Sequence, residues 1–347
     1  MVTIRVYTSA SAGEGGNLVD LDQLEQMVRG LRNAWIDMMF DVVGSEGPAA
    51  EEMFSEERNF LLETMGFHPL AVEDCFVEQV SRAERFENHR FVVMRARELD
   101  ESELDTEFLR VFLTDDVVVT VRHSPMPAVE AFGGRYRSAR LAKQLDRGPE
   151  FLLYELLDAV TDDWAVILDG YSNELDDIEY KVFDPSRKYP DLLEDLHVLK
   201  QNLREVSKSL VPLHEIISQM LKSDDDFLSD ENLIYYQDMA DNIKGQVDAV
   251  ANYSAGATST RDSYLSHVSM RLAESNARLS EVITTLTVIG AIMLPLTLIA
   301  GIFGMNVDAL SGGRSSIDLM HILSVMAIFA MLMLYYFYRK GWLTRRD

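Results

Sequence analysis

Apolar residues follow two different patterns in this chain, and the change falls near residue 282. Two long runs near the C-terminus carry no charged side chain, one from 282 to 307 and one from 319 to 338. About 20 apolar residues in a helix are enough to cross the hydrocarbon core of a membrane. The runs therefore predict transmembrane helices at 282–306 and 319–338. Two buried helices of a soluble core are the alternative, but core helices of this length keep a polar face, which these runs lack.

The first 150 residues have the pattern of a soluble domain. Short runs rich in β-branched and aromatic residues alternate there with segments of helical periodicity. The predicted strands lie at 2–8, 34–40, 90–98, 107–114 and 116–123, and the predicted helices at 18–33, 50–64 and 69–77. This order indicates a cytosolic α/β domain over residues 1–150, with a sheet covered by helices.

Residues 151–281 are helical in pattern. One amphipathic run ends at Asp184-Pro185, a second spans about 190–221, and a third begins near 231 without a stop signal before the first apolar run. We expect this third helix to continue into the membrane as a stalk of about 70 residues. Small residues at 253–257 would let neighbouring helices pack closely against it. The predicted fold class is therefore α+β: an N-terminal α/β domain, a long stalk helix and two C-terminal transmembrane helices.

Charge and motifs exclude several functions. The chain has 32 Lys and Arg against 57 Asp and Glu, a net charge of −25, so nucleic acid is excluded as a partner because phosphate binding needs clustered cations. Cys75 is the single cysteine, which rules out an intrachain disulfide. No HExxH, GxSxG or Walker motif occurs, and the histidines are scattered. We therefore predict that the protein is not an enzyme and uses no organic cofactor.

Cations beside the apolar runs predict the orientation in the membrane. Arg271 and Arg278 precede the first run, and a basic tail at 339–347 follows the second, whereas the connecting loop at 307–318 contains Arg314 alone. Cytoplasmic flanks carry the excess of Lys and Arg. We expect a protein of the inner (plasma) membrane with both termini in the cytoplasm and an extracytoplasmic loop. The absence of an apolar run at the N-terminus predicts that there is no secretory signal peptide.

One face of the first span mixes hydroxyls, glycines and aliphatic side chains. Two interpretations are open: a pore lining, in which aliphatic rings gate by dewetting, or a small-residue stripe for packing against another helix. Two helices cannot enclose a polar pathway alone, so ion movement would require several copies around an axis. The stripe comprises Ile283, Leu286, Thr287, Gly290, Leu294, Thr297 and Gly301.

Several motifs resemble the CorA magnesium-transporter family. The most specific is Gly-Met-Asn at 304–306, at the end of the first of two C-terminal spans and preceded by MLPLTLIAGIF. GFHPLAVED (66–74), FLLYELLDAVTDDW (151–164) and DSYLSHVS (262–269) resemble the cytosolic parts of the family. The resemblance implies a funnel-shaped homopentamer in the lipid membrane. It also implies uptake of divalent cations through a channel, Mg²⁺ first, with Co²⁺ and Ni²⁺ as further ions.

The resemblance also assigns roles to single residues. Gly304, Met305 and Asn306 would form the outer selectivity ring, and their neutral oxygens suit Mg²⁺, which gives up its water reluctantly. Ser280 would lie at the inner mouth of the pore. Cytosolic Mg²⁺ would act as a regulator and hold the channel closed by binding carboxylates between subunits. The candidate ligands are Asp74 and Asp238, with Glu73, Asp241 and Asp262 nearby; plain surface charge is the alternative for each.

The chain departs from the family pattern in two places. Its outer loop reads VDALSGGRSS, without the Met-Pro-Glu element that is common in the family, and the segment between DSYLS and the pore is longer than expected by about seven residues, two helical turns. Two other functions stay open. One is a Zn²⁺ transporter of the same superfamily, coupled to protons, although such proteins tend to have Gly-Ile-Asn where this chain has Met305. The other is a non-conducting membrane scaffold.

Overall fold

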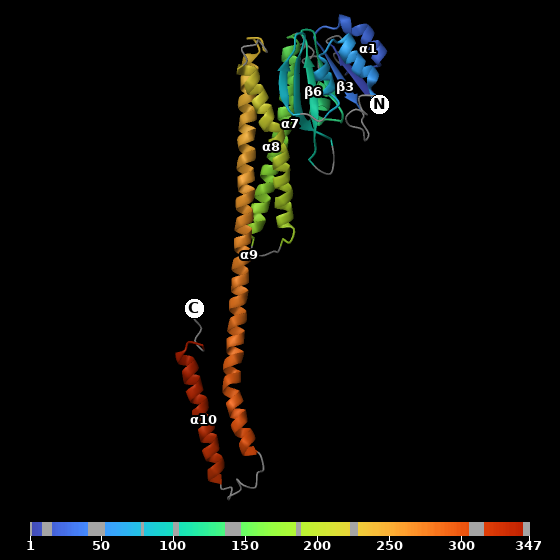
Figure 1. The fold of residues 1–347 in the computed structure, drawn as a ribbon. Helices are drawn as coiled ribbons and strands as arrows, with labels where there is room; N and C mark the ends of the chain where they lie inside the picture. Colours follow the sequence, from blue (N-terminus) through green and yellow to red (C-terminus); the bar gives the residue numbers. More distant parts are fainter. Residues whose placement is uncertain are drawn as a thin grey trace. The chain divides into compact units, whose positions relative to one another are not determined.

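The structure is a computed structural model of the chain. It describes residues 2–8, 16–40, 53–77, 80–99, 104–135, 147–184, 189–222, 228–304 and 316–342. These residues form two compact units, Met1–Arg261 and Asp262–Asp347 (Figure 1). Helix α9 (Leu233–Gly304) contributes to both units, which confirms the prediction that the third cytosolic helix continues into the first apolar run.

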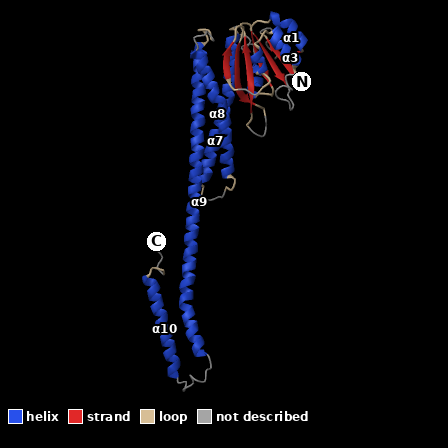
Figure 2. Cartoon of the chain, viewed as in Figure 1, coloured by secondary structure: helices blue, strands red, loops and turns tan. Residues whose placement is uncertain are grey.

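A seven-stranded sheet forms the centre of the first unit (Figure 2). The strand order is β2-β1-β3-β7-β6-β5-β4, and β3 and β7 pair in parallel while all other pairs are antiparallel. The five predicted strands are confirmed to within one residue at each end, whereas the short β2 and the polar β4 were not predicted. The strands are β1 (Val2–Tyr7), β2 (Asn17–Val19), β3 (Ala34–Phe40), β4 (Arg82–Arg85), β5 (Arg90–Arg97), β6 (Thr106–Leu113) and β7 (Val117–Arg122).

Both faces of the sheet are covered, so its central strands are buried throughout. Alternate residues of a strand point to opposite faces: Ile36 and Met38 join the core beneath the N-terminal helices, while Trp35 stacks on Tyr7 and packs against Phe132 on the other face. The first face is covered by α1 (Leu21–Met27), η2 (Val28–Gly30), α3 (Ser55–Asn59), the π-helical turn η3 (Phe60–Thr64) and α4 (Pro69–Glu73), which are shorter than the predicted helices. The second face is covered by α5 (Pro127–Arg135) and α7 (Pro149–Phe183).

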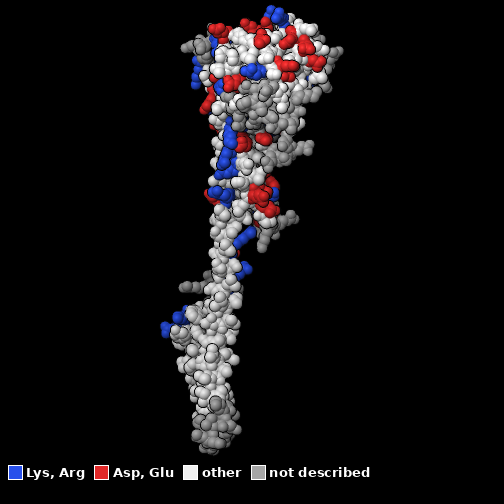
Figure 3. All heavy atoms as spheres, turned by 45° about the vertical axis from the view of Figure 1, so that its right-hand side comes forward, with Lys and Arg blue, Asp and Glu red and all other residues white. Residues whose placement is uncertain are grey.

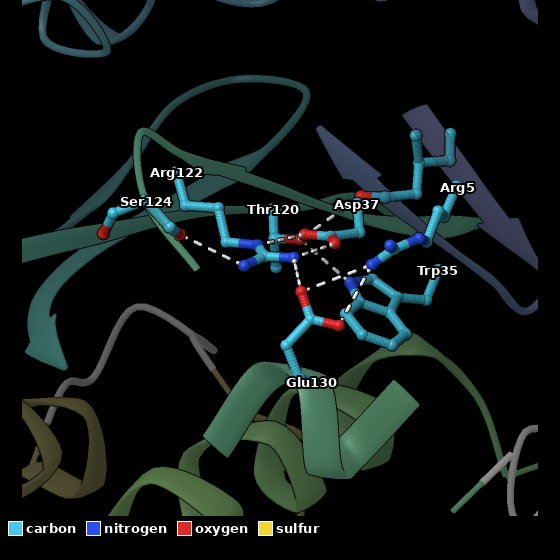
Figure 4. A network of polar contacts seen from close by, with 8 residues as sticks. Arg5, Trp35, Asp37, Thr120, Arg122, Ser124 and Glu130 are labelled. Carbon is cyan, nitrogen blue, oxygen red and sulfur yellow. Dashed lines mark hydrogen bonds and ion pairs between the residues drawn. The ribbon is translucent and has the colours of Figure 1, made fainter. Parts of the chain in front are cut away.

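A buried ion-pair network joins α5 to the sheet (Figure 4). The Arg122 guanidinium, with no exposed surface, donates from Nη2 to Asp37 at 2.8 Å and to Glu130 at 2.7 Å. The Thr120 hydroxyl donates to Asp37 at 2.8 Å and accepts from Trp35 at 3.0 Å. Because arginine already occupies these carboxylates, the network serves to hold the fold together, and removal of one partner would leave an uncompensated buried charge.

Helices α7, α8 (Leu192–Lys222) and the first part of α9 complete the first unit. Gln246 of α9 donates a 3.1 Å hydrogen bond to the Thr161 carbonyl of α7. A Cβ atom added at Gly256 would stand 3.0 Å from the Leu175 side chain, so α9 approaches α7 closely at this point. The prediction that the small residues at 253–257 permit close helix packing is thereby confirmed.

The second unit pairs the remainder of α9 with α10 (Ser316–Arg339). Both helices are long and apolar enough to span a membrane. On the face shown in Figure 3, charged side chains gather on the first unit, while the α9–α10 pair is almost entirely uncharged. The predicted α+β fold class, with a long helix and two apolar C-terminal helices, is confirmed.

Candidate ion pathway and cytosolic cation sites

The predicted stripe of α9 is open in the single chain. Ile283, Leu286 and Leu294 are 63%, 71% and 73% exposed. The Thr287 and Thr297 hydroxyls donate to the helix carbonyls four residues earlier, at 2.7 and 2.8 Å. With the proton used in this way, each threonine oxygen keeps lone pairs that accept hydrogen bonds from water. The exposed face therefore combines aliphatic side chains with acceptor oxygens.

A different face of α9 packs within the second unit. Val288 is only 4% exposed, and the half-buried Ala291, Ile292, Pro295 and Ile299 lie on the same side. At 3.6 residues per turn this side points away from the stripe. The stripe is therefore not the buried side of α9, which leaves it open to lipid, to water or to another copy of the chain.

The outer end of the pathway is only partly described. Helix α9 ends at Gly304, while Met305 and Asn306 lie outside the described residues. At the other end, Ser280 is exposed, and its carbonyl accepts a 2.8 Å hydrogen bond from Thr284. The roles of these residues stay predictions.

Asp74 already has a cationic partner. It follows α4 directly, its side chain is 12% exposed, and its carboxylate forms an ion pair with Arg82 of β4. The backbone carbonyl of Asp74 accepts a 2.9 Å bond from the buried Arg110. Burial raises the pKa of Asp74 above its usual value, against the opposing effect of Arg82. This pairing was not predicted from the sequence, since the distance from residue 74 to 82 fits no local spacing rule.

The other candidate ligands are exposed, and Asp238 has acidic neighbours. Glu73, Asp238, Asp241 and Asp262 are all exposed. Burial and nearby carboxylates, Asp162 and Asp238 among them, raise the pKa of Asp158 on α7. Burial is also the main cause that raises the pKa of Tyr154 to about 12, and several nearby carboxylates contribute to the rise. The sequence signal for these partners is the spacing of Glu155, Asp158 and Asp162, which places them on one side of α7.

The carboxylates supply oxygen ligands of the kind that Mg²⁺ prefers. Among the described residues, however, no group of three or more His, Cys, Asp or Glu is arranged to hold a metal ion. In the single chain, Asp238 therefore lies near the carboxylates of α7, whereas Asp74 forms an ion pair with an arginine.

The chain is similar to several known metal-ion transport proteins. The chain is 32% identical over 284 residues to the cobalt/magnesium transport protein CorA of Thermotoga maritima, covering 81% of this chain and 78% of that protein. It has the fold of the complete CorA magnesium transporter structure from Methanocaldococcus jannaschii, with a TM-score of 0.65 and 19% identity over 99% of both chains. The zinc transport protein ZntB of Photorhabdus laumondii is 20% identical over 208 residues, or 59% of this chain and 58% of that protein.

The match to a family model spans both units. It covers residues 51–339, from the N-terminal helices of the first unit to the last residue of α10. The match includes both apolar helices and the Gly-Met-Asn sequence between them. The chain belongs to the CorA-like Mg²⁺ transporter family.

Proposed function

We propose that this protein carries Mg²⁺ into the cell as a homopentameric channel, with Co²⁺ and Ni²⁺ as further ions. The observation that carries the proposal is the open stripe of α9, which α10 leaves uncovered and which leads to Gly304, Met305 and Asn306. Five such stripes around an axis would line a continuous path. The named activities of the relatives, cobalt and magnesium transport, support the choice of ions.

The chemistry of the stripe suits a hydrated divalent ion. Aliphatic rings exclude water when the path is narrow, and threonine and amide oxygens accept from the water shell without removing it. Both termini lie in the cytoplasm, with residues 1–281 forming the cytosolic part. Entry is then driven by the inside-negative potential, at about 2.3 kcal/mol per charge per 100 mV and twice that for a divalent ion.

Cytosolic Mg²⁺ closes the channel in this proposal. Ions bound between subunits at Asp74 and Asp238, with Glu73, Asp241 and Asp262 as further candidate ligands, neutralise carboxylates and hold the cytosolic parts together. Loss of the ions lets the subunits separate and the aliphatic rings wet. The surroundings of Asp238 support this role: burial first, and then the carboxylates of Asp162 and Asp238, raise the pKa of Asp158, so Asp238 lies near other acidic side chains.

Transport of Zn²⁺ coupled to protons is the second candidate. The identity to a zinc transport protein favours it, while Met305 speaks against it. The test is uptake into liposomes containing the purified protein, with dyes that report Mg²⁺ and Zn²⁺ separately, with and without a pH gradient. We expect Mg²⁺ uptake driven by voltage alone and its loss in Asn306→Ala. Zinc uptake that needs the pH gradient would establish the second candidate, and no uptake of either ion would indicate a scaffold.

A further inference from the structure

Two arginines contact Asp74, the residue that the proposed function assigns to Mg²⁺: one at its carboxyl group and one at its backbone carbonyl. Arg82 forms an ion pair with Asp74 through Nη2, and its Nε contacts Glu84 at 3.0 Å. Arg110, which is 2% exposed, donates to the Asp74 carbonyl at 2.9 Å and to Phe108 at 3.0 Å. Arg110 is therefore fixed, whereas the partly exposed Arg82 is the cation that can leave.

Binding of a divalent ion to the Asp74 carboxylate and the ion pair between Asp74 and Arg82 are mutually exclusive. Mg²⁺ binds through carboxylate oxygen directly or through its water shell, and the Asp74 side chain exposes only 12% of its surface. A cation that approaches it meets the positive charge of Arg82 first. Binding therefore requires Arg82 to turn away from Asp74.

The position of Arg82 in the sheet allows this movement. Strand β4 is the last strand of the sheet, and it pairs with β5 alone. The Arg82 side chain is 31% exposed, and Glu84 on the same strand offers it another carboxylate. Release from Asp74 leaves the guanidinium solvated and still partly paired.

We propose that Arg82 competes with Mg²⁺ for the Asp74 carboxylate and so sets the Mg²⁺ concentration at which this cytosolic site fills. The inference rests on the proposed gating by Mg²⁺ at Asp74. When only a fraction of the protein is free to bind a ligand, the apparent affinity falls by that fraction. An ion pair with Arg82 in about nine molecules of ten raises the Mg²⁺ concentration needed for half occupancy about tenfold.

The test measures Mg²⁺-dependent protection of the full-length protein against limited proteolysis, at constant ionic strength. Wild type is compared with Arg82→Gln and with Arg85→Gln, a matched control on the same strand whose side chain is exposed. We expect Arg82→Gln to lower the midpoint of protection about tenfold and Arg85→Gln to leave it within about twofold. Equal midpoints for the two variants would overturn the proposal.

Two further variants make the test specific. Asp74→Asn should weaken protection. Addition of Arg82→Gln to this variant should not shift the midpoint further, because the carboxylate for which Arg82 and Mg²⁺ compete is no longer present. A tenfold shift that persists in the double variant would refute competition at Asp74. If Arg82→Gln does not fold, Glu84→Gln is used instead. This variant removes the second carboxylate partner of Arg82, so the ion pair with Asp74 should strengthen and the midpoint should rise two- to threefold. A lower midpoint would count against the proposal.

Failure of this inference is distinguishable from failure of the proposed function. Mg²⁺ uptake by the same wild-type preparation in liposomes reports transport without reference to Arg82. If wild type takes up Mg²⁺ but Arg82→Gln does not change the midpoint of protection, only the proposed competition by Arg82 is overturned. Absence of uptake would overturn the proposed transport, whatever the protection midpoints show.

Discussion

Arg90 of β5 donates a 2.6 Å hydrogen bond to Glu150 in the first turn of α7. The other carboxylate oxygen of Glu150 accepts from the Ser229 hydroxyl at 2.6 Å and from Asn232 at 3.0 Å, just before α9 begins. One carboxylate thus links the sheet, α7 and the start of the long helix. Burial alone would raise the pKa of Glu150, but hydrogen bonds from Ser229, Asn232 and Arg90 hold it below its usual value.

We expect Glu150→Gln to destabilise the protein by about 2 kcal/mol, because Arg90 loses its counter-charge while partly buried. The stabilisation by Glu150 is present above its unfolded pKa near 4.5 and is lost as pH falls toward the lower folded value. Thermal unfolding of the detergent-solubilised protein, with Mg²⁺ held constant, measures the effect. Glu155→Gln is the control: burial and Asp158 raise the pKa of Glu155, so its neutralisation should leave stability unchanged or increase it.

The two faces of α9 in the second unit should respond differently to substitution. Leu294→Ser replaces an exposed aliphatic side chain on the stripe; if the proposed pentamer lines its path with this side chain, the barrier to wetting falls, so we expect a several-fold increase in Mg²⁺ uptake. Val288→Ala acts on the buried face and should lower the unfolding temperature without raising uptake. Liposome uptake and thermal unfolding of both variants check this. Equal effects on uptake would show that the stripe does not line the path.

Two glycines of α9 provide a matched pair for helix packing. A Cβ atom at Gly245 would meet nothing within 4 Å, while one at Gly256 would stand 3.0 Å from Leu175. Alanine is favoured over glycine within a helix by about 1 kcal/mol. We expect Gly245→Ala to raise the unfolding temperature, and Gly256→Ala to raise it less or to lower it. An equal gain would mean that Leu175 moves aside at no cost.

His89 should make the first unit sensitive to acid. It stacks on Phe86, its Nδ1 lies 2.7 Å from Asn88, and burial lowers its pKa from 6.5 to about 4. Between pH 6.5 and 4 the unfolded chain therefore binds a proton at His89 and the folded protein does not. The free energy of unfolding falls over this range, by on the order of 2 kcal/mol. Unfolding temperatures at pH 7 and pH 5 should differ less in His89→Phe than in wild type, and an undiminished difference would exclude His89 as the cause.

Local sequence patterns predicted the strands and helices whose own residues have a clear apolar pattern. The runs of apolar and β-branched residues in 34–40 and 116–123 predicted strands within one residue of β3 and β7, because a strand buried on both faces needs such a run. Strand β4 reads RAER, and it was missed because its pairing with β5, not its composition, makes it a strand. The helix predicted at 18–33 was too long, since β2 occupies Asn17–Val19 and η2 ends at Gly30, while the helix predicted at 50–64 ends at Thr64 as predicted and its first three residues lie outside the described residues.

The amino-acid sequence by itself determined the two membrane spans, the unbroken helix that enters the first of them, and the Gly-Met-Asn resemblance. Each depends on the solvation or spacing of consecutive residues. Only the tertiary structure decided which face of α9 stays open and which residue neutralises Asp74. Those properties depend on contacts between segments far apart in the chain: α10 covers one side of α9, and the edge strand β4 brings Arg82 to the end of α4. The energy of an ion pair depends on the distance between the charges in space, and their separation along the chain does not limit it.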